Sequence, residues 1–260
     1  MLNVNELLLY YPKPLQVYRE FILREYLQCK ILQIIFTRPE NSTKLCFLGG
    51  TCLRIVHGNS RFSEDIDFDN VGLSEVEFKA LSGTIKKELE REGYEVEIKT
   101  VLKGAFHCYI RFPGLLFQES LTGHKEQKIL VQLDTEAQHF DFSPQKFILN
   151  KFDVFTEIPV TPLDILLAQK FFTVMNRKRS KGRDFFDIIF LLSLKVKPNY
   201  DYLRLKVNIV EAKTLKARIL ETCAKLDMKA MANDVSPFLF NPSDSNKIEL
   251  FEQYIKQVEL

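Results

Sequence analysis

The chain has 260 residues, 46% of them hydrophobic and 27% charged, which is the composition of an ordinary globular protein with one large domain or two small ones. Lys and Arg number 36 against 34 Asp and Glu, so the formal net charge is only +2. This balance excludes a protein that coats nucleic acid with a uniformly basic surface, and any nucleic-acid site must be a local patch.

Cysteine usage and hydropathy indicate the compartment. The five cysteines are an odd number without Cys-x-x-Cys spacing, which indicates neither a disulfide framework nor a zinc site. The apolar run at residues 7–11 lacks the basic region and cleavage site of a signal peptide, and no apolar stretch approaches the roughly 20 residues that span a membrane. We therefore expect a cytoplasmic protein without a membrane partner.

Helices and strands alternate in the first half of the chain. Apolar spacing predicts helices over 15–37, from near Thr51, and over 74–93, where Ser74 and Glu77 form a capping box. Strands are expected at 45–48, 62–69, 94–102, 105–112 and 128–135. This order predicts an α/β (α+β) fold, with a mixed sheet domain and its N-terminal helix over residues 1–160.

Helices dominate the second half. Thr161 followed by Pro162 and Asp164 predicts a capped helix start. Helices are expected at 162–176, 183–195, 209–226 and 247–258. We therefore predict a helical domain over residues 161–260.

The most informative segment ends in two aspartates that are two residues apart. In a strand, Ser63, Asp65 and Asp67 would share one face. Two carboxylates side by side are unfavourable unless a cation neutralises them, and Mg²⁺ suits oxygen ligands while keeping sites for water and phosphate. We interpret Asp65 and Asp67 as metal ligands, although such a pair alone is usually a solvated strand face.

Gly49, Gly50 and Thr51 lead from a strand into a helix. Glycines allow a phosphate to approach the backbone closely, and a helix N-terminus attracts anions. A Gly-Gly pair alone is usually a turn, but its distance from the aspartates predicts a triphosphate cradle facing a metal-binding strand. Asp134, which follows an apolar strand, is either a turn former or the third carboxylate of a two-metal site.

Several charged residues in the helical half can be interpreted either as structural or as functional. Lys170 falls on the apolar stripe of its helix, so it either snorkels to the surface or binds a phosphate. Five cations within residues 177–183 form either a solvated loop or a patch for RNA or nucleotide phosphates. Arg183 and Asp187 are four residues apart and can pair on one helix face. The four histidines lack metal-ligand spacing.

Four segments together resemble the AbiEii-type nucleotidyltransferases, which are toxins of bacterial abortive-infection and toxin–antitoxin pairs and include the MenT-type toxins. The segments are residues 47–54 (FLGGTCLR), 61–68 (RFSEDIDF), 168–170 (AQK) and 183–187 (RDFFD). The resemblance implies a polymerase-β-like nucleotidyltransferase sheet followed by a helical domain that completes the active-site cleft. It also implies transfer of a nucleotide from an NTP with Mg²⁺, for some members to the 3′ end of tRNA.

The resemblance carries roles onto individual positions. By position, Gly50 and Thr51 would bind the triphosphate, and Lys170 would contact phosphate. Asp65 and Asp67 would hold metal, and Asp187 would be a catalytic or orienting acid. To these we add, on our own reading, two groups: Asp134 as a third metal ligand and candidate general base, and the nucleotide-binding residues Gly49, Ser63 and Arg183.

The resulting hypothesis is a Mg²⁺-dependent nucleotidyltransferase toxin with an RNA acceptor, such as tRNA, and a cognate antitoxin encoded nearby. One alternative is a degenerate transferase fold that binds nucleotide or RNA without chemistry, although Asp65, Asp67 and Lys170 argue against it. The other alternative keeps the chemistry but uses a protein or small-molecule acceptor. The basic run at residues 177–183 favours RNA.

Overall fold

The computed structural model describes all of residues 1–260, and the chain divides into two compact units. The first, which we call the sheet unit, comprises Met1–His57 and Phe62–Val160. The second, the helical unit, comprises Gly58–Arg61 and Thr161–Leu260. The prediction that the helical part completes an active-site cleft stays a prediction.

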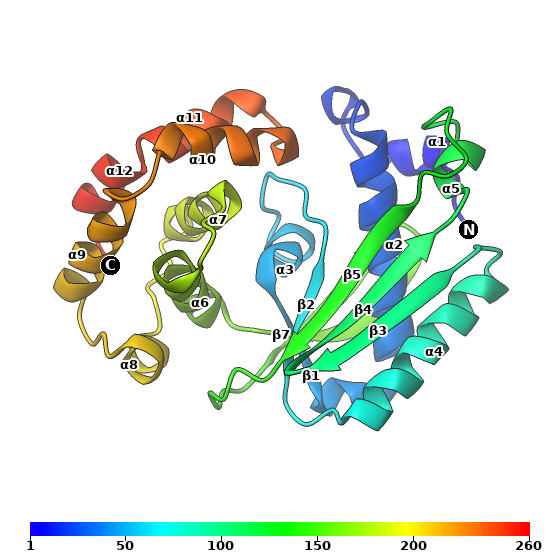
Figure 1. Ribbon diagram of the computed structural model, residues 1–260, viewed down its shortest axis with the longest axis horizontal. Coiled ribbons are helices and arrows are strands. Elements are labelled where there is room, and N and C mark those ends of the chain that lie inside the picture. The colour runs from blue at the N-terminus through cyan, green and yellow to red at the C-terminus, as the bar shows by residue number, and fades with distance from the viewer. The chain divides into compact units, whose positions relative to one another are not determined.

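The sheet unit is built on one seven-stranded sheet with the strand order β3-β4-β5-β2-β1-β7-β6 (Figure 1). The strands are β1 (Leu45–Leu48), β2 (Ile66–Asn70), β3 (Glu97–Lys103), β4 (Ala105–Phe112), β5 (Ile129–Glu136), β6 (Gln145–Lys151) and β7 (Val154–Val160). The β2–β5 and β1–β7 pairs are parallel and the other pairs are antiparallel. The sheet is therefore mixed, and the predicted fold class is confirmed.

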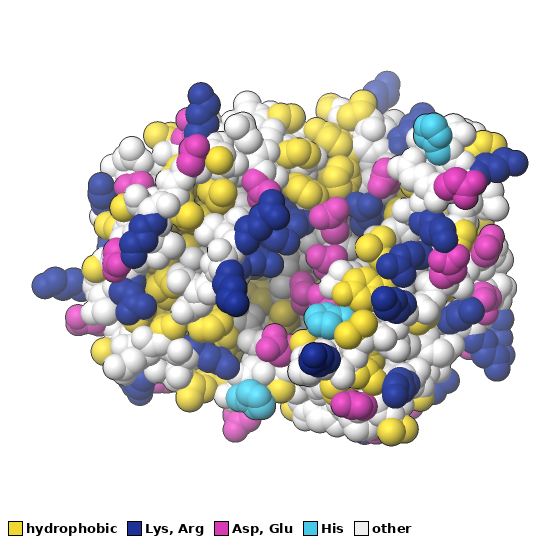
Figure 2. Space-filling model, in the orientation of Figure 1, with side chains coloured by type: hydrophobic (Ala, Val, Ile, Leu, Met, Phe, Trp, Pro, Cys, Tyr) yellow, Lys and Arg dark blue, Asp and Glu magenta, His cyan; other side chains and the backbone are white.

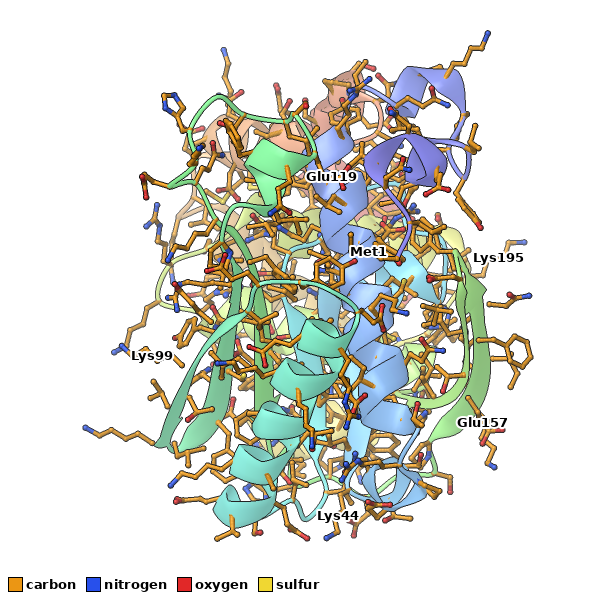
Figure 3. The ribbon with its side chains drawn as sticks, turned by 90° about the vertical axis from the view of Figure 1, so that its right-hand side faces the viewer. Met1, Lys44, Lys99, Glu119, Glu157 and Lys195 are labelled. Carbon is orange, nitrogen blue, oxygen red and sulfur yellow. The ribbon has the colours of Figure 1, made fainter.

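Helices α2 (Arg19–Phe36) and α4 (Glu75–Arg91) lie side by side over one face of this sheet (Figure 3). The predicted capping box opens α4: the Ser74 hydroxyl accepts from the Glu77 N–H, and the Glu77 carboxylate accepts from the Ser74 N–H. Between helix and sheet, the buried Phe68 ring lies 5.8 Å from Phe36 and 5.7 Å from Phe47, centroid to centroid. The shorter helical elements of the unit are α1 (Val4–Leu8), η1 (Lys13–Leu15), η2 (Pro39–Thr43), α3 (Gly49–Ile55) and α5 (Leu115–Gln118).

The strand predicted at 62–69 is wrong at its start, because β2 begins at Ile66. Before β2 the backbone finds another partner: the buried Gln28 side chain of α2 donates to the carbonyls of Ser63 and Glu64 at 3.1 and 2.9 Å. A side chain therefore satisfies carbonyls that a neighbouring strand would otherwise bind. The hairpin of β6 and β7 was not predicted at all.

The helical unit contains five longer helices and several short ones. They are α6 (Leu163–Asn176), α7 (Gly182–Ser193), α8 (Tyr200–Val207), α9 (Ala212–Cys223), α10 (Met228–Val235), η3 (Ser236–Phe238), η4 (Pro242–Ser245), α11 (Asn246–Glu249) and α12 (Phe251–Gln257). The predicted cap at Thr161 is wrong, because Pro162 occupies the N-cap position without a side-chain hydrogen bond. The sequence patterns missed α8 and α10, and no helix of the chain is long and apolar enough to cross a membrane.

The four residues Gly58–Arg61 lie between α3 and β2 in the sequence but pack within the helical unit. Arg61 forms an isolated antiparallel bridge with Leu239, and the Phe240 N–H donates to the Ser60 carbonyl at 3.1 Å. This segment, which we call the inserted segment, is therefore bound by backbone hydrogen bonds to residues near the end of the chain.

Candidate active site

Asp67 and Asp134 are direct register partners on the neighbouring parallel strands β2 and β5. Register partners on adjacent strands lie about 4.8 Å apart and point to the same face of the sheet. Both side chains are half-buried. The structure thus brings together a carboxylate pair from two strands, on the side of the sheet where Figure 2 shows acidic side chains gathered around β2 and β5.

Asp65 lies one residue before β2, so its position relative to Asp67 is not fixed by strand alternation. Its backbone carbonyl accepts a hydrogen bond from the hydroxyl of Thr51, which is fully buried. Thr51 therefore ties the start of α3 to the residues that precede β2. The Thr51 hydroxyl is therefore already used as a donor within the chain.

Helix α3 begins at Gly49, two residues earlier than expected. Gly49 has a φ of +81°, and a Cβ at this position would overlap Oδ2 of Asp67. Only glycine combines this backbone conformation with such a close carboxylate. The first N–H groups of α3, at Gly49, Gly50 and Thr51, have no acceptor within the helix, which is the property expected of a phosphate-binding turn.

Asp134 is held in place by two neighbours that the sequence patterns missed. His107 Nδ1 lies 2.7 Å from Oδ1 of Asp134, and Gln132 Nε2 donates to both carboxylate oxygens at 2.9 Å. The antiparallel register of β4 and β5 pairs His107 directly with Asp134. His107 could have been identified only from the pairing of β4 with β5, because the spacing of residues along the sequence does not specify it.

The donor set suits Mg²⁺ in part. Two carboxylates on adjacent strands supply the hard oxygen ligands that Mg²⁺ prefers. No three His, Cys, Asp or Glu side chains gather closely enough to form a complete ligand set. The residues therefore fit an ion that completes its shell with water and substrate phosphate oxygens, which is the usual habit of Mg²⁺.

In the helical unit, a buried ionic network surrounds Asp187 of α7. Arg61 donates to it through two nitrogens, Asn59 donates at 2.8 Å, and Lys170 lies 2.7 Å from Oδ2. Burial alone would raise the pKa of Asp187, but the charges of Arg61 and Lys170 lower it to about 2. Asp187 is thus a fully enclosed carboxylate anion.

Lys170 of α6 joins this network instead of snorkelling to the surface. Its ammonium lies 3.0 Å from Asp184 and 2.7 Å from Asp187. Burial alone would lower the pKa of Lys170, but these two carboxylates raise it above its usual value. An ammonium has three N–H donors, so two acidic partners leave one donor for another acceptor.

Some residues of the basic run at 177–183 contact other side chains, and others are exposed to solvent. Arg177 pairs with Asp184 at 2.8 Å, and the Arg183 guanidinium lies 4.5 Å from the ring centroid of Phe238. Lys178 and Arg179 are exposed. The exposed pair is the part of the run that remains available to a polyanion.

A second buried carboxylate, Glu25 of α2, anchors helix α3 through an ion pair with Arg54. Arg54 in the last turn of α3 donates to it at 2.8 Å, Lys151 also pairs with it, and the Tyr11 hydroxyl donates at 2.6 Å. Burial alone would raise the pKa of Glu25, but Arg54 and Lys151 lower it. Because these partners are scattered along the chain, no sequence pattern revealed the cluster.

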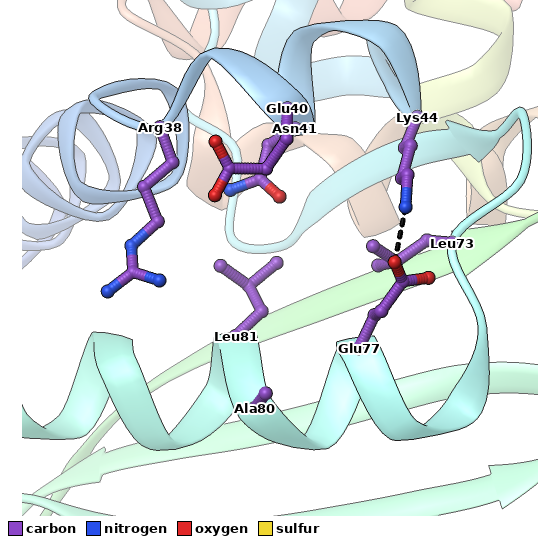
Figure 4. Close-up of a pocket in the computed structure, with 8 residues that line it drawn as sticks. All are labelled: Arg38, Glu40, Asn41, Lys44, Leu73, Glu77, Ala80 and Leu81. Atoms are coloured by element: carbon purple, nitrogen blue, oxygen red, sulfur yellow. Dashed lines mark hydrogen bonds and ion pairs between the residues drawn. The ribbon is translucent and has the colours of Figure 1, made fainter.

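A small pocket lies away from these residues, between η2 and α4 (Figure 4). An ion pair between Lys44 and Glu77 closes one end of it, and Arg38 lies at the other (Figure 4). None of the predicted site residues lines this pocket.

The geometry thus places Gly49, at the start of α3, against Asp67, and pairs Asp67 with Asp134 across β2 and β5. The family described as nucleotidyl transferase AbiEii toxin, type IV TA system, matches residues 30–254. The chain therefore belongs to the AbiEii nucleotidyltransferase toxin family.

Two solved structures are similar to this chain. JHP933 from Helicobacter pylori shares the fold, with a TM-score of 0.53 and 16% identity over 90% of this chain and 91% of that one. MenT4, a nucleotidyltransferase toxin from Mycobacterium tuberculosis, gives a TM-score of 0.48 with 14% identity over 98% and 99% of the two chains. No curated protein matches the chain in sequence.

Proposed function

We propose that this protein is a Mg²⁺-dependent nucleotidyltransferase that transfers NMP from an NTP to a hydroxyl of an RNA acceptor, such as the 3′ end of tRNA. The observation that carries the proposal is the pairing of Asp67 with Asp134 against Gly49, in a chain of the AbiEii family. We also propose that a cognate antitoxin is encoded nearby, since the family description names a toxin–antitoxin system.

In this proposal the sheet unit binds the triphosphate and the metal. The N–H groups of Gly49, Gly50 and Thr51 donate to phosphate oxygens. Ser63, two residues before Asp65 in the sequence, is a further proposed nucleotide contact. Asp67 and Asp134 would hold Mg²⁺ together with water and phosphate oxygens, and Asp65 would have to move toward them to add a third carboxylate. The ion would supply positive charge against the negative charge that develops on the departing pyrophosphate. Because Gly49 has no side chain, the backbone lies close to the carboxylate of Asp67. A phosphate bound at this backbone would therefore lie close to the same carboxylate.

Asp134 is the candidate general base as well as a ligand, because a carboxylate offers lone pairs on two oxygens. The acceptor oxygen forms a bond to the α-phosphorus, the bond from that phosphorus to pyrophosphate breaks, and the acceptor proton moves to Asp134. His107 and Gln132 hold the Asp134 carboxylate in a fixed orientation for this transfer.

The helical unit contributes cations in this proposal. Lys170 keeps one N–H donor for a phosphate oxygen after pairing with two aspartates. Arg183 is the second proposed nucleotide contact. Asp187 already accepts from Arg61, Asn59 and Lys170, which supports an orienting role for this acid instead of contact with substrate.

Incubation with labelled NTPs, Mg²⁺ and total tRNA tests the proposal. We expect label on RNA with the wild type and with Asp141→Asn, which changes an exposed acid of the same unit. Asp67→Asn and Asp134→Asn should abolish the label while leaving the thermal unfolding curve in place. Label on protein instead of RNA would identify another acceptor, and NTP binding without label would indicate a binding module.

A further inference from the structure

The strands β3, β4 and β5 expose one face on the side away from α2 and α4. Along β4, Cys108, Ile110 and Phe112 are buried, while the alternate residues point the other way and are half-buried. Figure 3 shows Lys99 of β3 projecting on the side of the sheet opposite to both helices. This surface, which we call the open face, carries Glu97 and the polar residues Lys99, Lys103, His107, Tyr109, Arg111 and Gln132.

The open face is continuous with the carboxylate pair. The strand register aligns Asp67, Asp134 and His107 in one row, and Gln132, Tyr109 and Lys99 in the next row on the same face. Two residues along a strand and one strand across place Tyr109 about 8 Å from Asp134, backbone to backbone. Tyr109 is therefore within reach of the neighbouring nucleotide of an acceptor whose terminal hydroxyl lies at Asp134.

Unpaired positive charge gathers on this face. Lys128 is neutralised by Glu97 at 2.7 Å, whereas Lys99, Lys103 and Arg111 have no acidic partner. Figure 2 shows Lys and Arg side chains spread over β3 to β5, next to a histidine and the acidic group. The cations lie beyond the carboxylates, where they can bind a polyanion without neutralising the aspartates.

An aromatic ring lies among these cations. The Arg111 guanidinium is 5.6 Å from the ring centroid of Tyr109, and the His107 ring is 6.4 Å away with an interplanar angle of 31°. Unpaired nucleic-acid strands bind to surfaces of this chemistry, because bases stack on aromatic rings and guanidinium planes while lysines contact the phosphates. Val101, Ala105 and Leu130 lie on the same face and are half-buried among these polar side chains, so the face is mixed. A protein partner would favour a continuous apolar centre.

We propose that the open face binds the unpaired end of an RNA acceptor, with one base stacked on Tyr109 and the strand phosphates at Lys99, Lys103 and Arg111. This inference rests on the proposed function, because it assigns the acceptor strand to a surface beside Asp134. The nucleotide whose hydroxyl reacts lies at the carboxylates, and the preceding one lies over Tyr109.

The test compares Tyr109→Ala, Tyr109→Phe and Lys99→Glu in the transfer reaction, with KM measured separately for tRNA and for NTP. Tyr109→Ala should raise the KM for tRNA by roughly 5- to 150-fold, the range for loss of one stacked base. Tyr109→Phe keeps the ring and should restore the wild-type value. Lys99→Glu should also reduce the salt dependence of the tRNA KM, because one phosphate contact is lost.

Lys87→Glu is the matched control, since it makes the same charge change at an exposed position of α4. It should leave the KM for tRNA unchanged. An unchanged tRNA KM in Tyr109→Ala and Lys99→Glu would overturn the proposal, and so would a rise in the NTP KM alone, because the face would then hold the nucleotide.

Fluorescence anisotropy with a labelled single-stranded oligoribonucleotide, without NTP, separates this inference from the proposed function. If the wild type labels no RNA but binds the oligonucleotide, and Tyr109→Ala weakens that binding, the proposed reaction fails while the RNA-binding face stands. If the wild type labels RNA and the Tyr109→Ala and Lys99→Glu variants bind the oligonucleotide as tightly as the wild type, the face is not the acceptor surface.

Discussion

Arg61 and Asp187 form a bidentate ion pair that is shielded from solvent. Nε of Arg61 donates to Oδ1 at 2.7 Å and Nη2 donates to Oδ2 at 2.6 Å, with side-chain exposures of 2% and 0%. The two residues are 126 positions apart in the sequence. The pair fixes the inserted segment, Gly58–Arg61, within the helical unit. In the sequence this segment follows Gly49 and precedes Asp67.

Asp187→Asn should strongly destabilise the protein. The change leaves Arg61 and Lys170 buried without their shared anion, and removing one partner of a buried ion pair costs about 3–5 kcal/mol in the free energy of unfolding. Urea denaturation at pH 7 measures this loss. Asp201→Asn removes an exposed acid of α8 that pairs only with an exposed arginine, and it should leave the midpoint unchanged.

The contribution of Asp187 should depend on pH in a defined direction. Its pKa is lowered from 3.8 to about 2, so its ionised form is favoured in the folded protein. Its stabilisation is therefore complete above the unfolded pKa and is lost as the pH falls through the folded one. The stability difference between wild type and Asp187→Asn should be constant above pH 5 and shrink toward pH 2. A difference that does not change over this range would contradict the assignment.

Gly49→Ala should reduce transfer activity more than stability. The new Cβ would displace the Asp67 carboxylate, and a shift of about 1 Å at a reacting centre costs about 100-fold in rate. Gly93→Ala is the control, because Gly93 also has a positive φ, +95°, but no atom lies within 4 Å of the added Cβ. Both variants should lose about 1–2 kcal/mol of unfolding free energy from backbone strain, and only Gly49→Ala should lose kcat.

Glu25→Gln should destabilise the sheet unit and loosen helix α3. Arg54 and Lys151 would be left without their anion, which costs about 3–5 kcal/mol by the same reasoning as for Asp187. Hydrogen exchange at the amides of α3 should become faster than in the wild type. Glu20→Gln on the same helix removes a half-exposed acid and should change neither measurement. Equal behaviour of the two variants would show that the Glu25 cluster does not anchor α3.

Two helical glycines should respond to alanine in opposite directions. At Gly182, the first residue of α7, an added Cβ would overlap the Met231 carbonyl of α10, so Gly182→Ala should lower the melting temperature. At Gly83 within α4 no atom lies within 4 Å of the added Cβ. Gly83→Ala should therefore stabilise the protein by about 0.5–1 kcal/mol, the gain in helix propensity.

Local spacing was sufficient where the responsible contacts are local. Ser74 and Glu77 are three residues apart, and the capping box that they predict is present. The strand that ends near Asp134 was also predicted, because apolar alternation encodes one buried face. The turn into α3 follows from Gly49 and Gly50, although the helix starts two residues earlier than expected.

Contacts between distant residues escaped the sequence patterns. The spacing of Arg183 and Asp187 predicted a pair on one helix, but the carboxylate of Asp187 is held by Arg61, Asn59 and Lys170. Asp65 lies outside β2 because Gln28 binds the preceding carbonyls. His107 acquires its place beside Asp134 only through strand register. In each case the partner comes from another element, so no local pattern specifies it.

The inserted segment makes the helical unit a discontinuous domain. The chain leaves the sheet unit after His57, returns after Arg61 and leaves again after Val160. A fragment ending at residue 160 would therefore still contain four residues of the missing half, with Arg61 deprived of Asp187 and of its backbone bridge to Leu239. The two halves therefore cannot be separated, fused or exchanged as modules at residue 160 without leaving Arg61 in the remaining piece without its carboxylate partner.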